Sequence, residues 1–480
     1  MIDSAPVMHD PTTLEAPQAL ASAPAFFRRA MAAILLVAVI LRVGLLFYAE
    51  RHPQRFDFPD SHRYVRVARN IAAGLGPIDR APAGGSQVGG ESGVVLAGTD
   101  PLYPMILSVG IKLGADEAPV GDQGRSDAVK RFARIINVLF ALASILLLAG
   151  ITRRLIGPRA ALVAAAILAV DPILLFFNAL VLTETCYTTL LLAGFYAIIR
   201  MEGTGRKPAP QQTLSPRQAT SPRRSLPPEL AWAGVAGVCV GLGTLTRSSN
   251  LLMPLALAPF VWHFAGNRKA TPPVRRLGIL ACFLLTSALL LCPTIIRNHR
   301  LFGHFVPVRT GSGASLLEAL GPWADGGPGM DRIVYPPCPK TANEFERDRI
   351  CRREALDWAR SNPRATLRLA WQKLRRTWSI GLHAAGYTSP LYRAICWASV
   401  APVFALALFG VWRLRHRPGI VALLLLPAAY FTLVHVVFVG SVRYRLPAMP
   451  LIFALAAAGL CLGLNAAPDS SRRGRTMARS

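Results

Sequence analysis

Long apolar runs are the feature that most constrains this chain of 480 residues. Ten runs approach the roughly 20 residues that a helix needs to cross a bilayer, and backbone groups inside hydrocarbon must be paired within such helices. The chain is 52% hydrophobic and only 16% charged, which excludes disorder as its dominant state. We therefore predict an all-α polytopic membrane protein with about ten (9–12) spans, at residues 31–49, 135–151, 160–175, 183–199, 231–246, 251–264, 277–296, 394–412, 420–439 and 446–464.

The segments between the spans suggest how the chain is organised. A shorter apolar run at 102–113 predicts a re-entrant or interfacial helix, or an eleventh span. The stretch 201–228 is rich in Pro, Arg, Ser and Gln, a composition typical of flexible linkers. We predict an N-terminal tail (1–30), a transmembrane module (31–296) with outer loop 50–127 and linker 201–228, an outer segment (297–393), C-terminal membrane helices (394–464) and a basic tail (465–480).

Basic residues indicate the orientation of the spans. The formal net charge is +27, and most Lys and Arg of the short loops fall on the side that holds both ends of the chain. Cytoplasmic loops collect such residues, so we predict cytoplasmic termini in a bacterial inner membrane. Anionic lipid headgroups then neutralise the charge, and nucleic acid is not an expected partner.

Acidic residues are scarce and uneven. Of 26 Asp and Glu, ten lie in 50–127 and eight in 297–393, so carboxylates concentrate on the outer side. Asp60 follows Pro59 at the start of a predicted amphipathic helix, where it is either a catalytic carboxylate or a helix cap. Glu184 opens the fourth span and is either functional or a cap. Asp171 before Pro172 predicts a helix break.

Five arginines lie at the predicted outer ends of spans. The guanidinium group is a planar, permanently charged fork that suits phosphate. The alternative is that each side chain reaches towards lipid headgroups without a specific ligand. The five are Arg247, Arg297, Arg309, Arg443 and Arg445.

Several soluble-enzyme motifs are absent from the sequence. It has no phosphate-binding P-loop, no HExxH and no CxxC pair, which disfavours an ATP-driven pump. Cys338 and Cys351 lie thirteen residues apart in the outer segment, where they form a disulfide or remain free thiols.

The order of short motifs resembles polyprenyl-phosphate-dependent glycosyltransferases of the GT-C fold. The similar groups are the dolichyl-phosphate-mannose-protein mannosyltransferases and the related bacterial aminoarabinose lipid A transferases. The motifs are DSHRYVRVARNIAAGLG and GTDPLYP in the first outer loop, LTETCYTTLL, GLGTLTRSSNLLMP, IIRNHRLFGHFVPVRTGSG, the REALDWARSNPRATLRLAWQKLRRTW stretch and RYRLPAMP. Two positions differ from the family pattern, because Ser61 follows Asp60 where Asp-Glu is common and Ser248 replaces a Pro.

The resemblance implies a role for each candidate residue. Asp60 would be the general base of an inverting transfer from a polyprenyl-phosphate sugar, with Glu184 and Asp100 as supporting acids. Arginines, or a divalent metal held by carboxylates, would stabilise the departing phosphate. The implied phosphate ligands are Arg247, Arg297, Arg309 and Arg443, and the implied pocket residues are Tyr64 and Tyr103.

Two other classes of protein fit the composition. A flippase or transporter of lipid-linked sugars also needs about ten spans, but places charged groups on broken helices at mid-bilayer. A non-enzymatic envelope assembly protein would give the outer carboxylates no evident purpose. The sequence identifies neither the sugar nor the acceptor, which is a glycolipid, a polysaccharide or a protein.

Overall fold

The computed structural model describes residues 16–80, 94–115, 128–202, 227–265, 271–339, 341–381 and 389–464. The predicted tail 465–480 and nearly all of linker 201–228 lie outside these ranges. Helices dominate the described residues, and the described strands are one antiparallel pair, β1 (Asp79–Arg80) and β2 (Val94–Val95).

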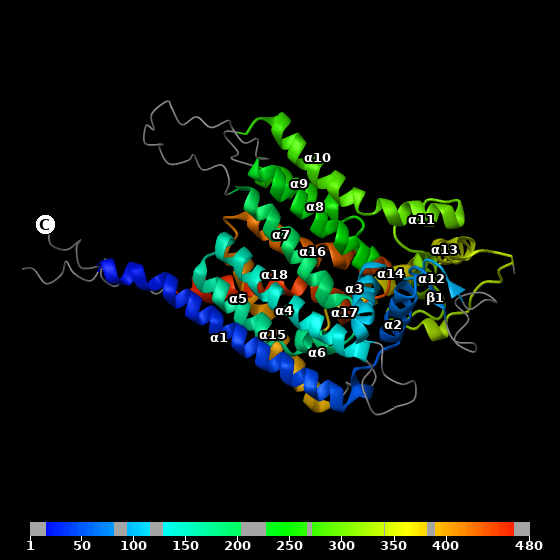
Figure 1. Ribbon diagram of the computed structural model, residues 1–480, viewed down its shortest axis with the longest axis horizontal. Helices are drawn as coiled ribbons and strands as arrows, with labels where there is room; N and C mark the ends of the chain where they lie inside the picture. The colour runs from blue at the N-terminus through cyan, green and yellow to red at the C-terminus, as the bar shows by residue number, and fades with distance from the viewer. Residues whose placement is uncertain are drawn as a thin grey trace, which may run out of the picture.

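A bundle of long helices fills the centre of the molecule, and a helix occupies most of every predicted span (Figure 1). The first helix extends further towards the N-terminus than the predicted span, to residue 16. The bundle helices are α1 (Ala16–Arg51), α4 (Ala128–Leu155), α5 (Pro158–Val170), α6 (Pro172–Ala179), α7 (Glu184–Met201), α8 (Pro228–Thr246), α9 (Met253–Phe264), α10 (Pro273–Leu289), α15 (Pro390–Arg413), α16 (Pro418–Val437) and α18 (Met449–Leu464). After α10, α11 (Cys292–Phe302) runs away from the bundle (Figure 1).

Two predicted spans are each two helices rather than one. The α5–α6 pair bends by 53° and the α10–α11 pair by 43°. Asp171 confirms its predicted role as a break signal, because its carboxylate accepts the Leu174 N–H at 2.8 Å and caps α6. Pro293 at the start of α11 cannot continue the hydrogen-bond ladder of α10.

The helices are long and apolar enough to make this a multi-pass membrane protein. Six described helices meet a length and hydropathy criterion for a span, or eight if each bent pair is one span. Ten spans therefore remains a prediction. The run at 102–113 forms α3 (Leu102–Gly110) followed by a π-helical turn, η3 (Ile111–Ala115), and is a short apolar helix.

Small residues allow the helices of the bundle to approach closely. A side chain at Gly410 of α15 would place its Cβ 1.9 Å from the Leu455 carbonyl oxygen of α18. A side chain at Gly459 would lie 2.3 Å from the Leu406 oxygen in the same way. Reciprocal small residues of this kind are typical of packing inside membranes, where dispersion contacts hold helices together.

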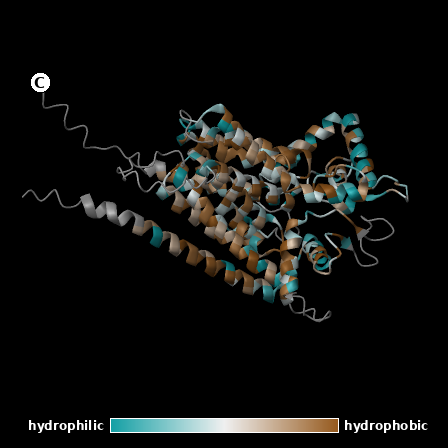
Figure 2. Cartoon of the chain, turned by 45° about the horizontal axis from the view of Figure 1, so that its top comes forward, coloured by the Kyte–Doolittle hydropathy of each residue, from teal (hydrophilic) through white to brown (hydrophobic). Residues whose placement is uncertain are grey.

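The outer segments gather at one end of the bundle, where polar residues are frequent (Figure 2). The 303–389 region returns to the bundle through α14, which packs against α16. The elements here are η2 (Pro53–Phe56), α2 (Pro59–Ala72), the β1–β2 pair, α3, η6 (Ser248–Asn250), α12 (Ser312–Ala319), η7 (Met330–Arg332), α13 (Glu344–Ser361), α14 (Pro363–Thr377), α17 (Val442–Arg445) and η8 (Leu446–Ala448).

Candidate active site

Arg443 joins two carboxylates from distant parts of the chain. It lies in α17, just before the last span, and its Nη1 donates to Asp60 Oδ2 of α2 at 2.6 Å. Its Nε donates to Glu184 Oε1, which also accepts from Arg247 Nη1 at 2.8 Å. The structure therefore brings together four residues that the sequence predicted for one site.

A second group adjoins the first. The Asp100 carboxylate accepts the Ser248 N–H at 3.2 Å and lies 3.6 Å from Arg309 Nε. The same Arg309 nitrogen donates to Ser248 Oγ at 3.0 Å. Ser248 directly follows Arg247 in sequence, so the two groups form one outer cluster of three carboxylates and three guanidinium groups.

The departure from the family pattern at Ser248 has a structural consequence. Its backbone N–H and its hydroxyl each make one of the bonds that link Asp100 and Arg309. Proline has neither group, so the serine supplies a connection that the usual residue lacks.

The outer cluster is graded in accessibility. The Glu184 side chain is 2% exposed, that of Arg443 22% and that of Asp60 33%. Asp60 and Arg443 are therefore the accessible members of this set, and Glu184 is the buried one.

Charge sets the protonation state of the accessible carboxylate. Burial favours the neutral form of Asp60, but Arg443, helped by Arg63 and Arg309, outweighs this and holds the pKa of Asp60 below its usual range. Burial raises the pKa of Asp100 despite the opposing effect of Arg309. The surroundings therefore favour the anionic form at Asp60 and disfavour it at Asp100.

The geometry argues against a role for Asp60 as only a helix cap. Phe58 is the N-cap of α2, and no side chain caps that helix end. The carboxylate of Asp60 instead reaches Arg443, which is 383 positions away in the chain. At Glu184 likewise, the N-cap Thr183 makes no capping bond through its side chain.

Aromatic side chains line the back of the cluster. Tyr64 lies one turn after Asp60 on α2 and contacts Tyr103 edge to face, with ring centroids 5.6 Å apart. Tyr103 is fully buried, and its hydroxyl contacts Asn137 at 3.4 Å, so it lies behind Tyr64. Tyr444 lies under the Arg247 guanidinium, whose carbon is 5.6 Å from the ring centroid.

Two of the five predicted arginines do not join the outer cluster. Arg297 Nη2 donates to the Leu96 carbonyl oxygen at 2.6 Å and supports the strand segment instead. Arg445 is 1% exposed and donates to the carbonyl oxygens of Thr377 and Ser379. Both guanidinium groups thus donate to backbone carbonyl oxygens. These contacts do not support the predicted phosphate role of Arg297.

Sequence reasoning missed Ser248, Tyr444 and Glu318. Glu318 on α12 is 7% exposed and accepts the Gly329 N–H at 2.8 Å. Burial raises its pKa, and the negative charge of Asp60 adds to this shift, which indicates that α12 faces the outer cluster. Of these three, only Tyr444 could have been predicted from the sequence, because it lies between Arg443 and Arg445, two of the candidate phosphate ligands.

Two further expectations concern sulfur and metal. Cys338 and Cys351 are both free thiols in the structure.

In the described part of the chain, no group of three or more His, Cys, Asp or Glu is placed to hold a metal ion. The carboxylates of the outer cluster are instead paired with arginines, so this donor set does not fit the alternative of a divalent metal.

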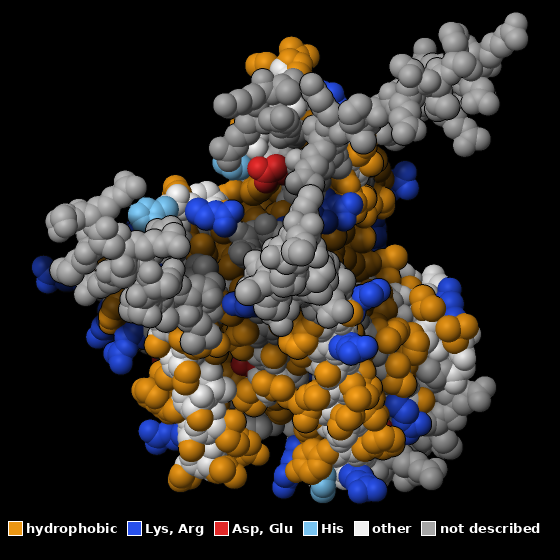
Figure 3. Space-filling model, turned by 90° about the vertical axis from the view of Figure 1, so that its left-hand side faces the viewer, with side chains coloured by type: hydrophobic (Ala, Val, Ile, Leu, Met, Phe, Trp, Pro, Cys, Tyr) orange, Lys and Arg blue, Asp and Glu red, His pale blue; other side chains and the backbone are white. Residues whose placement is uncertain are grey.

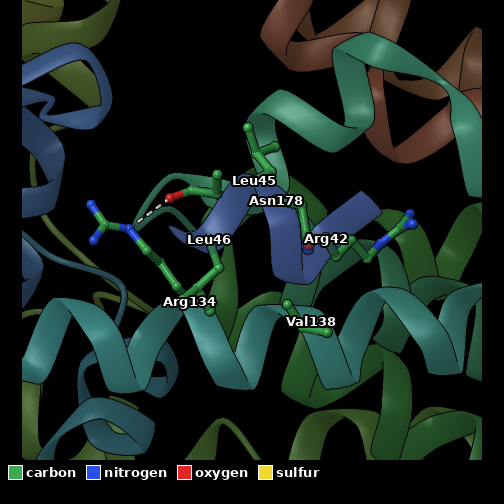
Figure 4. A pocket seen from close by; sticks show the side chains of 7 residues that line it. Arg42, Leu45, Leu46, Arg134, Val138 and Asn178 are labelled. Atoms are coloured by element: carbon green, nitrogen blue, oxygen red, sulfur yellow. Dashed lines mark hydrogen bonds between the residues drawn. The ribbon is translucent and has the colours of Figure 1, made fainter. Parts of the chain in front are cut away.

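A small cavity lies apart from the outer cluster, between α1, α4 and the end of α6. Figure 4 shows the guanidinium groups of Arg42 and Arg134 pointing away from each other, so mainly their aliphatic stems face the cavity. Arg134 donates to the Ala179 carbonyl oxygen at 3.1 Å. This cavity offers no evident charged recognition group.

Comparisons with known proteins agree with the fold and with part of the sequence. Residues 126–208, which include Glu184, match the dolichyl-phosphate-mannose-protein mannosyltransferase family. No curated protein sequence matches the chain.

The oligosaccharyltransferase of Archaeoglobus fulgidus, solved with a tethered acceptor peptide, is similar with a TM-score of 0.51 and 14% identity, over 92% of this chain and 50% of that one. The ArnT protein of Cupriavidus metallidurans, solved in the apo state, aligns with a TM-score of 0.33 and 17% identity, over 91% of this chain and 78% of that one. The chain thus spans about half the length of the archaeal enzyme.

These comparisons confirm the resemblance and the fold class that the sequence predicted. The chain is a multi-pass membrane protein with the GT-C glycosyltransferase fold, similar over residues 126–208 to the dolichyl-phosphate-mannose-protein mannosyltransferase family.

Proposed function

We propose that the protein transfers a sugar from a polyprenyl-phosphate donor to an acceptor on the outer face of the membrane, with inversion at the anomeric carbon. The observation that carries the proposal is the bridge from Arg443 to Asp60 and Glu184. It puts an accessible carboxylate beside several guanidinium groups at the outer end of the bundle, where a lipid phosphate would lie.

Each group has a chemical task in this reaction. Asp60 accepts the proton of the acceptor hydroxyl as that oxygen forms a bond to the anomeric carbon. The bond from the anomeric carbon to the phosphate oxygen breaks on the opposite side, and the electron pair stays on the phosphate. Arg443, Arg247 and Arg309 then stabilise the released polyprenyl phosphate.

The contacts of the Asp60 carboxylate leave one of its oxygens for the acceptor. Within the described part of the chain, Asp60 uses Oδ2 for Arg443, and Oδ1 makes no hydrogen bond. Oδ1 is therefore available to the acceptor hydroxyl. When the donor phosphate draws Arg443 towards itself, the carboxylate loses part of its stabilising partner and becomes a stronger base.

A transporter was the main alternative, with charged groups expected at a broken helix inside the membrane. Arg42 of α1 is 3% exposed and lies near the α5–α6 break. Its guanidinium group donates to the carbonyl oxygens of Leu168 and Ala169 at the end of α5. Arg42 thus satisfies a helix end, which is a structural task, and we keep the enzyme as the proposal.

The proposed orientation places both termini in the cytoplasm of a bacterial inner membrane. The end of the bundle remote from the outer cluster shows many Lys and Arg side chains and little Asp or Glu (Figure 3). This distribution is what the positive-inside rule expects of a cytoplasmic face.

Topology reporters test that orientation. We expect reporters fused near residue 205 and after Ser480 to signal cytoplasm, and a reporter near Gly327 to signal periplasm. Activity of paired alkaline phosphatase and fluorescent-protein fusions measures this. A cytoplasmic Gly327 would place Asp60 in the wrong compartment and overturn the proposal.

Replacement of Arg247 tests the phosphate site. We expect Arg247→Ala to raise the KM for the donor by roughly tenfold or more, because it removes charge-assisted hydrogen bonds. The matched control is Arg413→Ala at the other end of the bundle, where the guanidinium group lies over Phe409 and Trp412. Kinetics at matched protein abundance measures both, and equal small effects would favour a lipid-facing role for Arg247.

Mass spectrometry of envelope lipids and glycoproteins from a deletion strain would test the activity in cells. We expect one envelope component to lose a sugar residue, which would identify the acceptor and the sugar together. An unchanged envelope in conditions where the protein is produced would count against the proposal.

A further inference from the structure

The short turn at residues 437–445, which contains α17 and carries Arg443, contacts α14 of the outer segment. Lys373 lies on α14, is 1% exposed and donates from Nζ to the Val437 carbonyl oxygen at 2.8 Å. Val437 is the last residue of α16. The ammonium group therefore satisfies a carbonyl at the negative end of that helix, six positions before Arg443.

The backbone of the turn rests directly on α14. A Cβ at Gly440 would lie 2.4 Å from the Lys373 carbonyl oxygen, so only glycine allows this approach. The Gly440 N–H also donates to the Gly326 carbonyl oxygen at 2.8 Å, which ties the turn to the loop after α12. The start of the turn is thus fixed from two sides by the outer segment.

The end of the turn is fixed by the same helix. Arg445 donates to the carbonyl oxygen of Thr377, the last residue of α14, at 3.0 Å and to that of Ser379 at 2.5 Å. Lys373 and Arg445 therefore connect α14 to both ends of the 437–445 stretch. Arg443 lies between these two anchors.

A lysine at this position costs free energy, because its ammonium group must be removed from water. Burial lowers the pKa of Lys373 to about 8, and among the described residues its ammonium group contacts a backbone carbonyl rather than a carboxylate. An apolar side chain of similar volume would fill the space without burying a charge. The ammonium group instead donates to the Val437 carbonyl oxygen, at the start of the turn that carries Arg443.

We propose that Lys373 is a positioning residue, which holds the 437–445 turn so that Arg443 bridges Asp60 and Glu184. The effect of Lys373 on sugar transfer rests on the function proposed above, whereas its effect on the turn does not. The outer segment then sets the geometry of the phosphate site as well as covering it.

Lys373→Met tests the positioning role, because it keeps the length of the side chain and removes the donor. We expect amide hydrogen exchange of residues 438–445 to speed up, while exchange in α7 and α8 stays unchanged. We also expect kcat/KM for a polyprenyl-phosphate sugar to fall roughly ten- to a hundredfold, the scale of a misplaced binding group. The matched control is Arg368→Ala on the exposed face of α14.

A double variant separates positioning from general destabilisation. If Lys373 acts through Arg443, the Lys373→Met and Arg443→Ala double variant should transfer no more slowly than Arg443→Ala alone. Additive losses, or an unchanged exchange rate at 438–445, would overturn the proposal. If the wild-type protein transfers no sugar, the proposed function fails, but the exchange measurement still decides the positioning role.

A second variant covers the case in which Lys373→Met does not fold. Gly440→Ala keeps the ammonium group but forces the turn away from α14. We expect the same increase in exchange at 438–445 and the same lack of additivity with Arg443→Ala. Wild-type exchange and kinetics in this variant would overturn the proposal.

Discussion

Asp60→Asn is expected to lower the single-turnover rate of sugar transfer by roughly a hundred- to ten-thousand-fold, the usual contribution of general base catalysis. The amide keeps the shape of the side chain but cannot accept the proton of the acceptor hydroxyl. The measurement is transfer of label from a polyprenyl-phosphate sugar by excess purified protein. A helix cap would behave differently, since Asn caps a helix almost as well as Asp.

Thermal stability and donor binding are the controls for this variant. Asp60→Asn also weakens the contact with Arg443, so donor binding must be compared before the transfer rates are interpreted. Transfer at the wild-type rate would contradict the base role. Suspicion would then move to Asp100 and Glu184 within the cluster, ahead of Asp57, which is paired with Lys130 and His62.

Arg443→Ala is expected to have the second large effect, a loss of roughly a hundred- to a thousandfold in transfer. The substitution removes the group that joins Asp60 to Glu184 and that would stabilise the leaving phosphate. It also changes the pH dependence. Because Arg443 lowers the pKa of Asp60, its removal should raise that pKa and shift the acid limb of kcat/KM to higher pH.

Arg443→Lys is the matched comparison. It keeps the positive charge but replaces the planar fork, which contacts two carboxylates at once, with a single ammonium group. We expect intermediate transfer and a smaller shift of the acid limb. Equal activity of the alanine, lysine and wild-type proteins would contradict the role of Arg443, provided that all three remain folded.

The sequence was sufficient to predict the helices and much of the outer cluster. Apolar runs mark spans because the bilayer requires paired backbone groups, so helix occupies most of each predicted span, and two of the spans are bent helix pairs. Asp60 and Glu184 were predicted from the scarcity of carboxylates, and Arg247, Arg309 and Arg443 from their places at outer helix ends, together with the family resemblance. Scarcity was informative here, since a charge beside a membrane span needs a reason.

Other features depend on tertiary contacts that no local pattern encodes. Arg297 and Arg443 look alike in sequence, yet one meets a backbone carbonyl and the other meets two carboxylates. The difference arises from residues hundreds of positions away. The bend after α10 was missed for a different reason, because an apolar run has the same composition whether its helix is straight or bent.

Ser248 illustrates a third kind of miss. The family comparison presented it only as a departure from proline, with no indication of what a serine would contact. The structure places its N–H against Asp100 and its hydroxyl against Arg309. Short polar side chains in turns make contacts that depend on where other loops end, which periodicity does not predict.

Transfer without an energy source tests the central claim most directly. Detergent-purified protein is incubated with an undecaprenyl-phosphate sugar labelled in the sugar, and with an envelope lipid and protein extract, in the absence of nucleotide and of any membrane gradient. We expect free undecaprenyl phosphate to appear together with labelled acceptor, and we expect Asp60→Asn to produce neither. Folded wild-type protein that binds the donor but releases no undecaprenyl phosphate with any acceptor fraction would contradict that claim.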